Sequence, residues 1–273
     1  MTIAAGFVAR DGILLCTDSL YSGGVNIMGR KIFTHKYDFG VVSFALAGHE
    51  PFAKKAITDS DELIKENPSF CSDVAGFRRL IEQAVKNVQE QYVDTRPSDE
   101  RGRHAFELLI VIATREGGAH LFSSSGMVLT QVETFECFGS GAYVGHHIIQ
   151  TAYRPRMKLE EVATIAIHAK AAAKRYVEGV GGPTQFECVK HDGTTDTLSR
   201  FFPYDLASFV DAEITIYQEQ AAHLLLALTN SEVDDEELQR RVEAFVRSAK
   251  ETRANWQRDT KRSELFEFIR SSE

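Results

Sequence analysis

Two kinds of hydrophobic pattern alternate along the first 200 residues, and each predicts a type of secondary structure. Short apolar runs bounded by turn residues predict strands, and Asp11-Gly12 between the first two runs is a strong two-residue hairpin signal. Asp192-Gly193 predicts a second hairpin near the end of this region. The predicted strands are 2–9, 13–18, 32–36, 40–47, 108–114, 120–123, 128–132, 135–138, 184–189 and 195–198.

Apolar residues spaced by three and four positions predict two pairs of helices between the strand groups. The first pair covers residues 53–64 and 77–92, and the second covers 142–152 and 158–177. The order is therefore strands, helices, strands, helices, strands. Two sheets held between two helix layers is the natural packing for that order, so the expected fold class is α+β, a four-layer αββα sandwich.

The pattern changes after residue 200. Residues 204–228 are helical in composition, and a highly charged helix follows that carries an apolar stripe and continues past Trp256. Both charge signs are interleaved along it, which is typical of a solvated helix. We therefore expect an αββα domain over residues 1–200 and a helical C-terminal extension over residues 201–273.

The charge of the chain excludes several classes of partner. Its 273 residues include 31 Lys and Arg against 39 Asp and Glu, a net charge of −8. A protein that binds nucleic acid or anionic lipid needs clustered basic residues, which this balance disfavours. No apolar run approaches the ~20 residues that span a bilayer, and the first residues lack the regions of a signal peptide. The sequence predicts a cytoplasmic protein that binds neither nucleic acid nor membrane.

Cysteine and histidine give no sign of a metal site. The four cysteines are scattered, with no Cys-x-x-Cys pair, which is typical of reduced core thiols in a cytosolic protein. The nine histidines match no zinc-ligand spacing. We expect no metal and no cofactor.

Thr2 is the residue whose position suggests chemistry. A small residue behind Met1 allows methionine aminopeptidase to remove Met1, which would leave a threonine with a free α-amine beside its hydroxyl. A hydroxyl is a poor nucleophile until a base takes its proton. The α-amine, with an ordinary pKa of about 7.7–8.0, can be that base, and a nearby lysine held by a carboxylate would lower its pKa further.

The segment from Thr2 to Asp18 resembles the first hairpin of the proteasome β-type subunits. That family opens with threonine, places glycine four residues later, and continues with an Asp-Gly turn and an aliphatic run that ends in aspartate. Four later segments, in the same order along the chain, are similar to motifs of this family and of the bacterial proteasome-like peptidases. They are Gly29-Arg30-Lys31-Ile32-Phe33, Phe44-Ala45-Leu46-Ala47-Gly48, Phe138-Gly139-Ser140-Gly141 and Gly179-Val180-Gly181-Gly182.

The resemblance covers roughly residues 2–200 and implies an N-terminal-nucleophile hydrolase. Thr2 would be the nucleophile and, through its amine, the base. Asp18 and Lys31 would tune and orient it. Further roles fall to the Gly48 N–H as oxyanion donor, to Ser140 with Gly141 as support for the amine, and to Leu20, Ser22 and Leu46 as substrate pocket.

The same resemblance implies a threonine-type peptidase that hydrolyses peptide bonds in intracellular protein breakdown. The expected substrate is a peptide or unfolded protein. The expected assembly is a homo-oligomeric ring, with an ATPase unfoldase as a candidate partner.

One motif departs from the family pattern and keeps two alternatives open. The family usually has Asp-x-x-Ser-Gly-Gly where this chain has Val177 and, three residues later, Val180. One alternative is therefore a catalytically inactive ring or scaffold protein of the same fold. The other is an N-terminal-nucleophile amidase that acts on a small amide.

Overall fold

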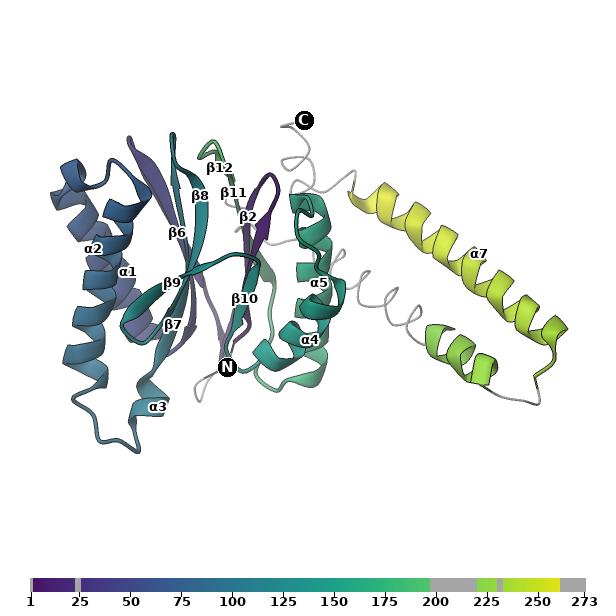
Figure 1. Cartoon of the computed structure of the whole chain (residues 1–273). Coiled ribbons are helices and arrows are strands. Elements are labelled where there is room, and N and C mark those ends of the chain that lie inside the picture. The colour runs from purple at the N-terminus through teal and green to yellow at the C-terminus, as the bar shows by residue number, and fades with distance from the viewer. Residues whose placement is uncertain (1, 23–25, 197–219, 230–232, 261–273) are drawn as a thin grey trace. The chain divides into compact units, whose positions relative to one another are not determined.

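The computed structural model of the protein describes residues 2–22, 26–196, 220–229 and 233–260. Two five-stranded antiparallel sheets lie face to face, and a layer of helices covers the outer face of each (Figure 1). This arrangement confirms the expected four-layer αββα sandwich.

The first sheet has the strand order β10-β1-β2-β11-β12 and carries the start of the chain. The predicted hairpin between the first two strands is confirmed. Its two turn residues are Arg10 and Asp11, because Gly12 already belongs to β2 and pairs with Ala9. The last predicted strand extends to residue 198, and its final two residues lie outside the described ones. The strands are β1 Ala4–Ala9, β2 Gly12–Asp18, β10 Phe135–Phe138, β11 Thr184–Lys190 and β12 Thr195–Asp196.

The second sheet has the strand order β5-β6-β7-β8-β9, so each strand pairs with the next one along the chain. A separate two-stranded ribbon, β3 Leu20–Ser22 with β4 Asn26–Met28, connects the two sheets in sequence and was not predicted. The strands of the second sheet are β5 Ile32–Tyr37, β6 Gly40–Gly48, β7 Phe106–Thr114, β8 Gly118–Ser125 and β9 Val128–Val132.

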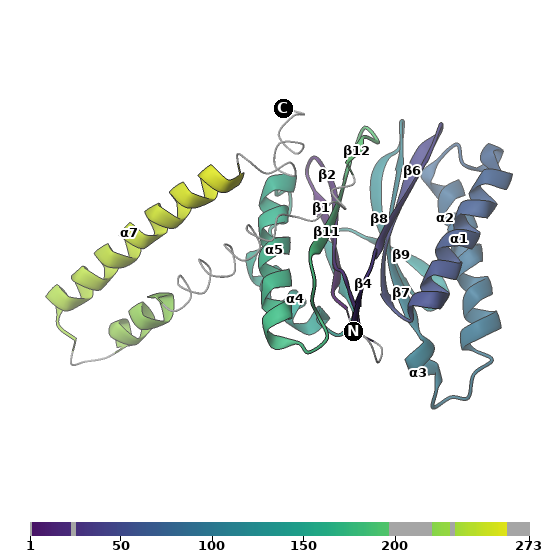
Figure 2. The same ribbon diagram turned by 180° about the vertical axis from the view of Figure 1, so that it is seen from behind.

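Each sheet packs against one of the two predicted helix pairs (Figure 2). Helices α1 (Glu50–Glu66) and α2 (Val74–Val88) cover the second sheet, and α4 (Ala142–Ala152) and α5 (Leu159–Tyr176) cover the first. Asp73 caps α2 by accepting a hydrogen bond from the Gly76 N–H at 2.8 Å. Shorter helical segments are a 3₁₀ turn Pro68–Phe70, a π-helical turn Gln89–Val93 and α3 Arg101–His104.

Alternation along the strands divides the buried side chains among three layers of core. Phe7 and Leu14 belong to the layer between the first sheet and its helices, and two more layers lie further across the sandwich. One layer fills the space between the sheets, and its members include Ile13, Leu15, Ile32, Ala45, Leu109 and Val111. The other lies between the second sheet and its helices, with Phe44, Leu46, Phe77, Ile81 and Ile110 among its members. Both faces of the second sheet are therefore apolar, as a sheet between two layers requires.

The chain divides into two compact units, Met1–Phe202 and Pro203–Glu273. The expected boundary at residue 200 lies outside the described residues, as do residues 204–219 of the expected helical segment. In the second unit, residues 220–229 are helical and α7 spans Asp235–Thr260, past Trp256. Within the parts of the chain that the structure describes, no helix has the length and hydropathy needed to cross a bilayer.

Candidate active site

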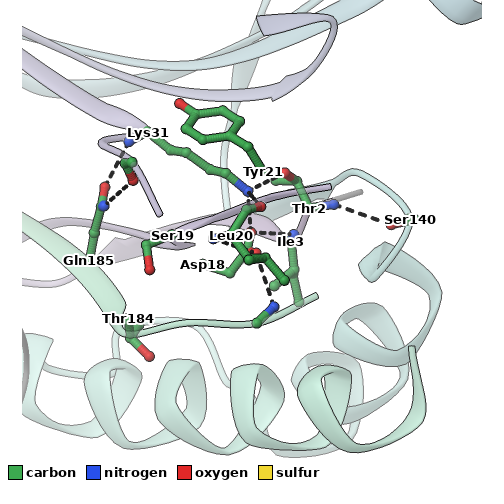
Figure 3. A network of polar contacts seen from close by, with 12 residues as sticks. Thr2, Ile3, Asp18, Ser19, Leu20, Tyr21, Lys31, Ser140, Thr184 and Gln185 are labelled. Atoms are coloured by element: carbon green, nitrogen blue, oxygen red, sulfur yellow. Dashed lines mark hydrogen bonds and ion pairs between the residues drawn. The ribbon is translucent and has the colours of Figure 1, made fainter. Parts of the chain in front are cut away.

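Thr2 lies buried where the chain enters β1, and the 139–141 loop holds its backbone. The Thr2 carbonyl accepts a hydrogen bond from the Gly141 N–H at 3.0 Å, and the Thr2 N–H donates to the Ser140 hydroxyl at 3.2 Å (Figure 3). Gly139 has a φ of +91°, and a Cβ atom there would lie 2.3 Å from the Thr2 carbonyl oxygen. Only glycine permits this close approach of the loop to Thr2.

Lys31 joins Thr2 to Asp18. Its Nζ atom donates to Oγ1 of Thr2 at 2.5 Å, to Oδ1 of Asp18 at 2.8 Å and to the Leu20 carbonyl at 2.6 Å (Figure 3). The side chains of Lys31 and Asp18 are both fully buried. Burial lowers the pKa of Lys31, and the Asp18 carboxylate opposes that shift. A buried ammonium with a carboxylate partner is thus aimed at the threonine hydroxyl.

Asp18 ends β2 and connects three segments of backbone. Its Oδ1 accepts a hydrogen bond from the Ile3 N–H at 3.1 Å, and its Oδ2 accepts from the N–H groups of Leu20 at 3.3 Å and Gly181 at 3.2 Å. Three backbone N–H groups and the Lys31 Nζ atom therefore converge on this one carboxyl group. The same hydrogen bonds fix the start of β1 and the turn after β2. Asp18 therefore orients the backbone around Thr2 and Lys31.

Gln185 positions the backbone that carries Lys31, and it was not predicted. Its Oε1 accepts a hydrogen bond from the Lys31 N–H at 2.8 Å, and its Nε2 donates to the Gly29 carbonyl at 2.7 Å. The signal available in the sequence is a polar residue inside β11, every residue of which is buried. Buried amide groups need hydrogen-bond partners, and the partners of the Gln185 amide are backbone groups just before β5.

Gly48 ends β6 with a φ of +81°, and a Cβ atom there would lie 2.5 Å from the Ala105 carbonyl oxygen. The Leu46 N–H donates to the Lys31 carbonyl at 3.1 Å. Alternate N–H groups of a strand point to the same side, so the Gly48 N–H points to the edge where Lys31 lies, beyond the first residue of β5. This N–H is therefore available in the direction of Lys31.

The three expected pocket residues come from two elements, Leu20 and Ser22 from β3 and Leu46 from β6. Leu46 is 1% exposed and belongs to the core beneath α1 and α2. Leu20 packs against Gly181, where a Cβ atom would come within 2.9 Å of the leucine Cδ2. Ser22 lies partly buried at the end of β3.

Tyr21, which was not predicted, also lies beside Lys31. Lys31 Nζ lies 4.9 Å from the centroid of its ring, and the Tyr21 hydroxyl donates to the Arg30 carbonyl at 2.6 Å. Lys54 Nζ lies 5.5 Å from the same ring and forms an ion pair with Glu50 at 2.5 Å. An aromatic ring therefore lies between Lys31 and the Lys54–Glu50 ion pair.

Val177 and Val180 are buried close to the loop that holds the Thr2 nitrogen. A Cβ atom on Gly141 would lie 3.4 Å from Cγ2 of Val180. Among the described residues, the Ser140 hydroxyl is the group that accepts a hydrogen bond from the Thr2 N–H. No cluster of three or more His, Cys, Asp or Glu side chains within the described ranges could hold a metal ion.

Comparisons with known proteins show the fold. No protein-family model and no curated protein matches the sequence. A mutant of Anbu from Hyphomicrobium sp. strain MC1 matches with a TM-score of 0.70 at 15% identity, over 82% of this chain and 97% of that chain. Anbu from Yersinia bercovieri, described as an ancestral beta-subunit, matches with a TM-score of 0.67 at 12% identity, over 83% and 97%.

A third match is the helical assembly of the Anbu complex from Pseudomonas aeruginosa, with a TM-score of 0.64 at 16% identity over 84% of this chain and 97% of that chain. Each match spans most of both chains, although the sequences share few residues. The protein therefore has the fold of Anbu, and the resemblance of its sequence to the proteasome β-type subunits implies the same four-layer arrangement.

Proposed function

We propose that the protein is a threonine-type peptidase in which Thr2, once it is the amino-terminal residue, is the nucleophile. The observation that carries this proposal is the chain of contacts from Thr2 Oγ1 to Lys31 Nζ at 2.5 Å and from Lys31 Nζ to Asp18 Oδ1 at 2.8 Å. The position of the Ser140 hydroxyl, 3.2 Å from the Thr2 nitrogen, supports it as well. Nucleophile, cation and carboxylate are the groups that such chemistry needs.

The proposed reaction has two stages. The free α-amine of Thr2 takes the hydroxyl proton as Oγ1 attacks the substrate carbonyl, and the Lys31 ammonium stabilises the oxygen that loses this proton. The tetrahedral intermediate collapses to an acyl-threonine ester, and the leaving amine takes the proton back from the α-ammonium. Water then hydrolyses the ester with the same amine as base, which releases the acid and restores Thr2.

The negative charge of the tetrahedral intermediate requires a donor. The Gly48 N–H points to the edge where Lys31 lies, and we assign it to the oxyanion. One such donor is typically worth about 10²–10³ in rate. Glycine suits this position because substrate and backbone must approach closely.

The decisive experiment compares the intact mass of the purified protein with the activity of Thr2 variants. We expect a mass that begins at Thr2, activity on peptide-coumarin substrates or casein, partial loss in Thr2→Ser and complete loss in Thr2→Ala. Thr130→Ala is the control, since Thr130 is exposed on β9. A mass that retains residues before Thr2, or equal activity of wild type and Thr2→Ala, would refute the proposal.

Two alternatives have a specific observation behind them. Val177 and Val180 stand where the family places a carboxylate and a hydroxyl near the terminal amine, which favours an inactive scaffold. The Lys54–Glu50 ion pair beside Tyr21 favours a small polar amide as substrate. Hydrolysis of small amides without cleavage of peptides or casein would select the amidase, and no hydrolysis of either would select the scaffold.

The proposal extends to assembly and location. A matched Anbu structure is described as a helical assembly, so we propose that this chain also forms a homo-oligomer and test it by light scattering of the purified protein. The four cysteines are buried free thiols, which suits the reducing cytoplasm. An unfolded protein delivered by an ATPase unfoldase is the proposed natural substrate.

A further inference from the structure

Glu107 on β7 contacts the loop that holds Thr2, and the proposed reaction does not use it. The Gly139 N–H donates a hydrogen bond to the Glu107 carboxylate. Glu107 is partly buried, and every other residue of β7 is buried. A carboxylate in such a strand is costly to remove from water, so its position calls for an explanation.

The register of β7 brings the Glu107 carboxylate to this loop. Phe106 and Leu108 belong to the core beneath α1 and α2, and Leu109 belongs to the layer between the sheets. Because side chains alternate along a strand, Glu107 faces the first sheet. Strand β7 packs against β10 of that sheet, and β10 continues directly into Gly139. The second sheet thus contacts the first residue of the loop.

Gly139 is the residue through which this loop lies against Thr2. A Cβ atom on Gly139 would lie 2.3 Å from the Thr2 carbonyl oxygen. The next residue, Ser140, accepts a hydrogen bond from the Thr2 N–H at 3.2 Å, and the Gly141 N–H donates to the Thr2 carbonyl at 3.0 Å. A displacement of Gly139 would move both contacts, because the residues that make them follow it directly.

Val177 and Val180 also lie near this loop, but they carry no polar side-chain atom. Both are buried, and a Cβ atom on Gly141 would lie 3.4 Å from Cγ2 of Val180. The hydrogen bond to Glu107 therefore supplies a directional contact that these valines cannot make. It also joins the loop to the second sheet, whereas the loop itself continues a strand of the first.

Glu136 is the charged side chain that acts on Glu107. Burial raises the pKa of Glu107, the hydrogen bond from the Gly139 N–H opposes this shift, and the negative charge of Glu136 reinforces it. Glu136 has partners of its own, because its Oε1 atom accepts a hydrogen bond from the Cys137 N–H at 2.9 Å and lies 3.3 Å from His146 Nε2. Glu107 therefore titrates above the ordinary value of 4.5.

The other elements around Glu107 bring few titratable groups to it. Strand β1 has none, and the residues opposite Glu107 on β6 and β8 are Ala47 and Ser125. The α-amine of Thr2, once it is terminal, lies beside the same loop. Lys170 of α5 is buried in the helix layer beyond the first sheet, where its Nζ atom donates to the Thr184 hydroxyl at 2.9 Å.

We propose that Glu107 is a positioning residue of the candidate active site, which acts through Gly139 to hold the Ser140 hydroxyl against the Thr2 nitrogen. An ionised carboxylate accepts a stronger hydrogen bond than a neutral one, so the loop is held most firmly when Glu107 is charged. The consequence for catalysis rests on the proposed function, whereas the contact between Glu107 and the loop does not.

The first test needs no activity. Nuclear magnetic resonance of the full chain labelled with nitrogen-15 follows the Gly139 amide from pH 4 to 8. An amide proton that donates to a carboxylate shifts when the carboxylate is protonated, so we expect an inflection above pH 4.5 that Glu107→Gln removes. A Gly139 signal without an inflection overturns the proposal. So does an inflection that persists in Glu107→Gln, because Glu136 would then be its source.

The second test is the separation of kcat from KM in two variants of Glu107. Glu107→Ala should lower kcat about tenfold, the order expected for the loss of one hydrogen bond to a charged group, and should change KM less than about twofold. Glu107→Gln keeps an oxygen that can accept from the Gly139 N–H, so it should restore most of kcat. Glu116→Ala, an exposed glutamate in the turn after β7, is the control and should match wild type.

Wild-type kcat in Glu107→Ala, or a loss confined to KM, would overturn the positioning role. If Glu107→Ala does not fold, the nearly isosteric Glu107→Gln still decides the proposal through the Gly139 signal. An inflection that Glu107→Gln removes, in a protein that cleaves no substrate, upholds the contact with the loop and refutes the proposed peptidase instead.

Discussion

Replacing Lys170 by methionine should stabilise the protein in acid and destabilise it in base. Burial lowers the pKa of Lys170 from 10.5 to about 7. Between these two values the unfolded chain binds a proton that the folded chain has released, so wild-type stability rises with pH across this window. Each pH unit is worth about 1.36 kcal/mol, and the full window amounts to about 5 kcal/mol.

The penalty is complete below pH 7 and vanishes above pH 10.5, where both states are neutral. Lys170→Met removes it but leaves the Thr184 hydroxyl without its lysine partner, which costs about 1–2 kcal/mol at every pH. The variant should therefore be more stable than wild type by about 3–4 kcal/mol at pH 6. Its advantage should disappear near pH 9 to 10 and reverse above that.

The assay is urea unfolding followed by circular dichroism from pH 6 to 10, at one protein concentration, for wild type, Lys170→Met and the exposed control Lys86→Met. Titrating groups distant from Lys170 act equally in wild type and variant, so the difference in the free energy of unfolding reports on Lys170 and the charges beside it. A difference that stays constant with pH would refute the reasoning, because it would mean that Lys170 keeps the same charge in the folded and unfolded states.

Two further predictions concern the candidate site. Asp18→Asn should lower the free energy of unfolding by about 3–5 kcal/mol, because Lys31 keeps its burial and loses its counter-charge; Asp59→Asn, which breaks an exposed pair with Lys55, should cost under about 1 kcal/mol in the same denaturation assay. Gly48→Ala should lower kcat/KM by about 10²-fold, because the new Cβ atom lies 2.5 Å from a backbone oxygen and displaces the N–H. Gly126 has a φ of +73° and no atom within 4 Å of an added Cβ, so Gly126→Ala should introduce the same backbone strain but retain activity. An equal loss of activity in Gly48→Ala and Gly126→Ala would contradict the assignment of the Gly48 N–H to the oxyanion.

Much of the fold could be predicted because local chemistry and long-range packing agree. The hairpin signal at Asp11-Gly12, the alternation of the strands and the helical spacing each point to the same layered order, although the turn itself consists of Arg10 and Asp11. The β3–β4 ribbon was missed because its strands are three residues long and flank a glycine pair, so too few residues alternate to give a pattern.

The candidate site was accessible mainly through family resemblance. Thr2, Asp18 and Lys31 are separated along the chain, and no hydrophobic period requires that they meet. Gln185 and Lys170 are single polar residues in apolar segments, which look alike in sequence whether they support a site or merely satisfy a core. Leu46 faces the helices because alternate residues of a strand point to opposite faces.

The Lys31–Asp18 ion pair joins the two sheets of the sandwich. Asp18 ends a strand of one sheet, and Lys31 precedes a strand of the other. Gln185, on β11 of the first sheet, makes a second contact between the sheets by accepting a hydrogen bond from the Lys31 N–H. The distance between the Lys31 Nζ atom and the Asp18 carboxylate is thereby tied to the thickness of the apolar layer between the sheets. A change in that thickness would separate Lys31 from Asp18 while both sheets kept their hydrogen bonds, so the proposed activity would be lost without the unfolding of any strand.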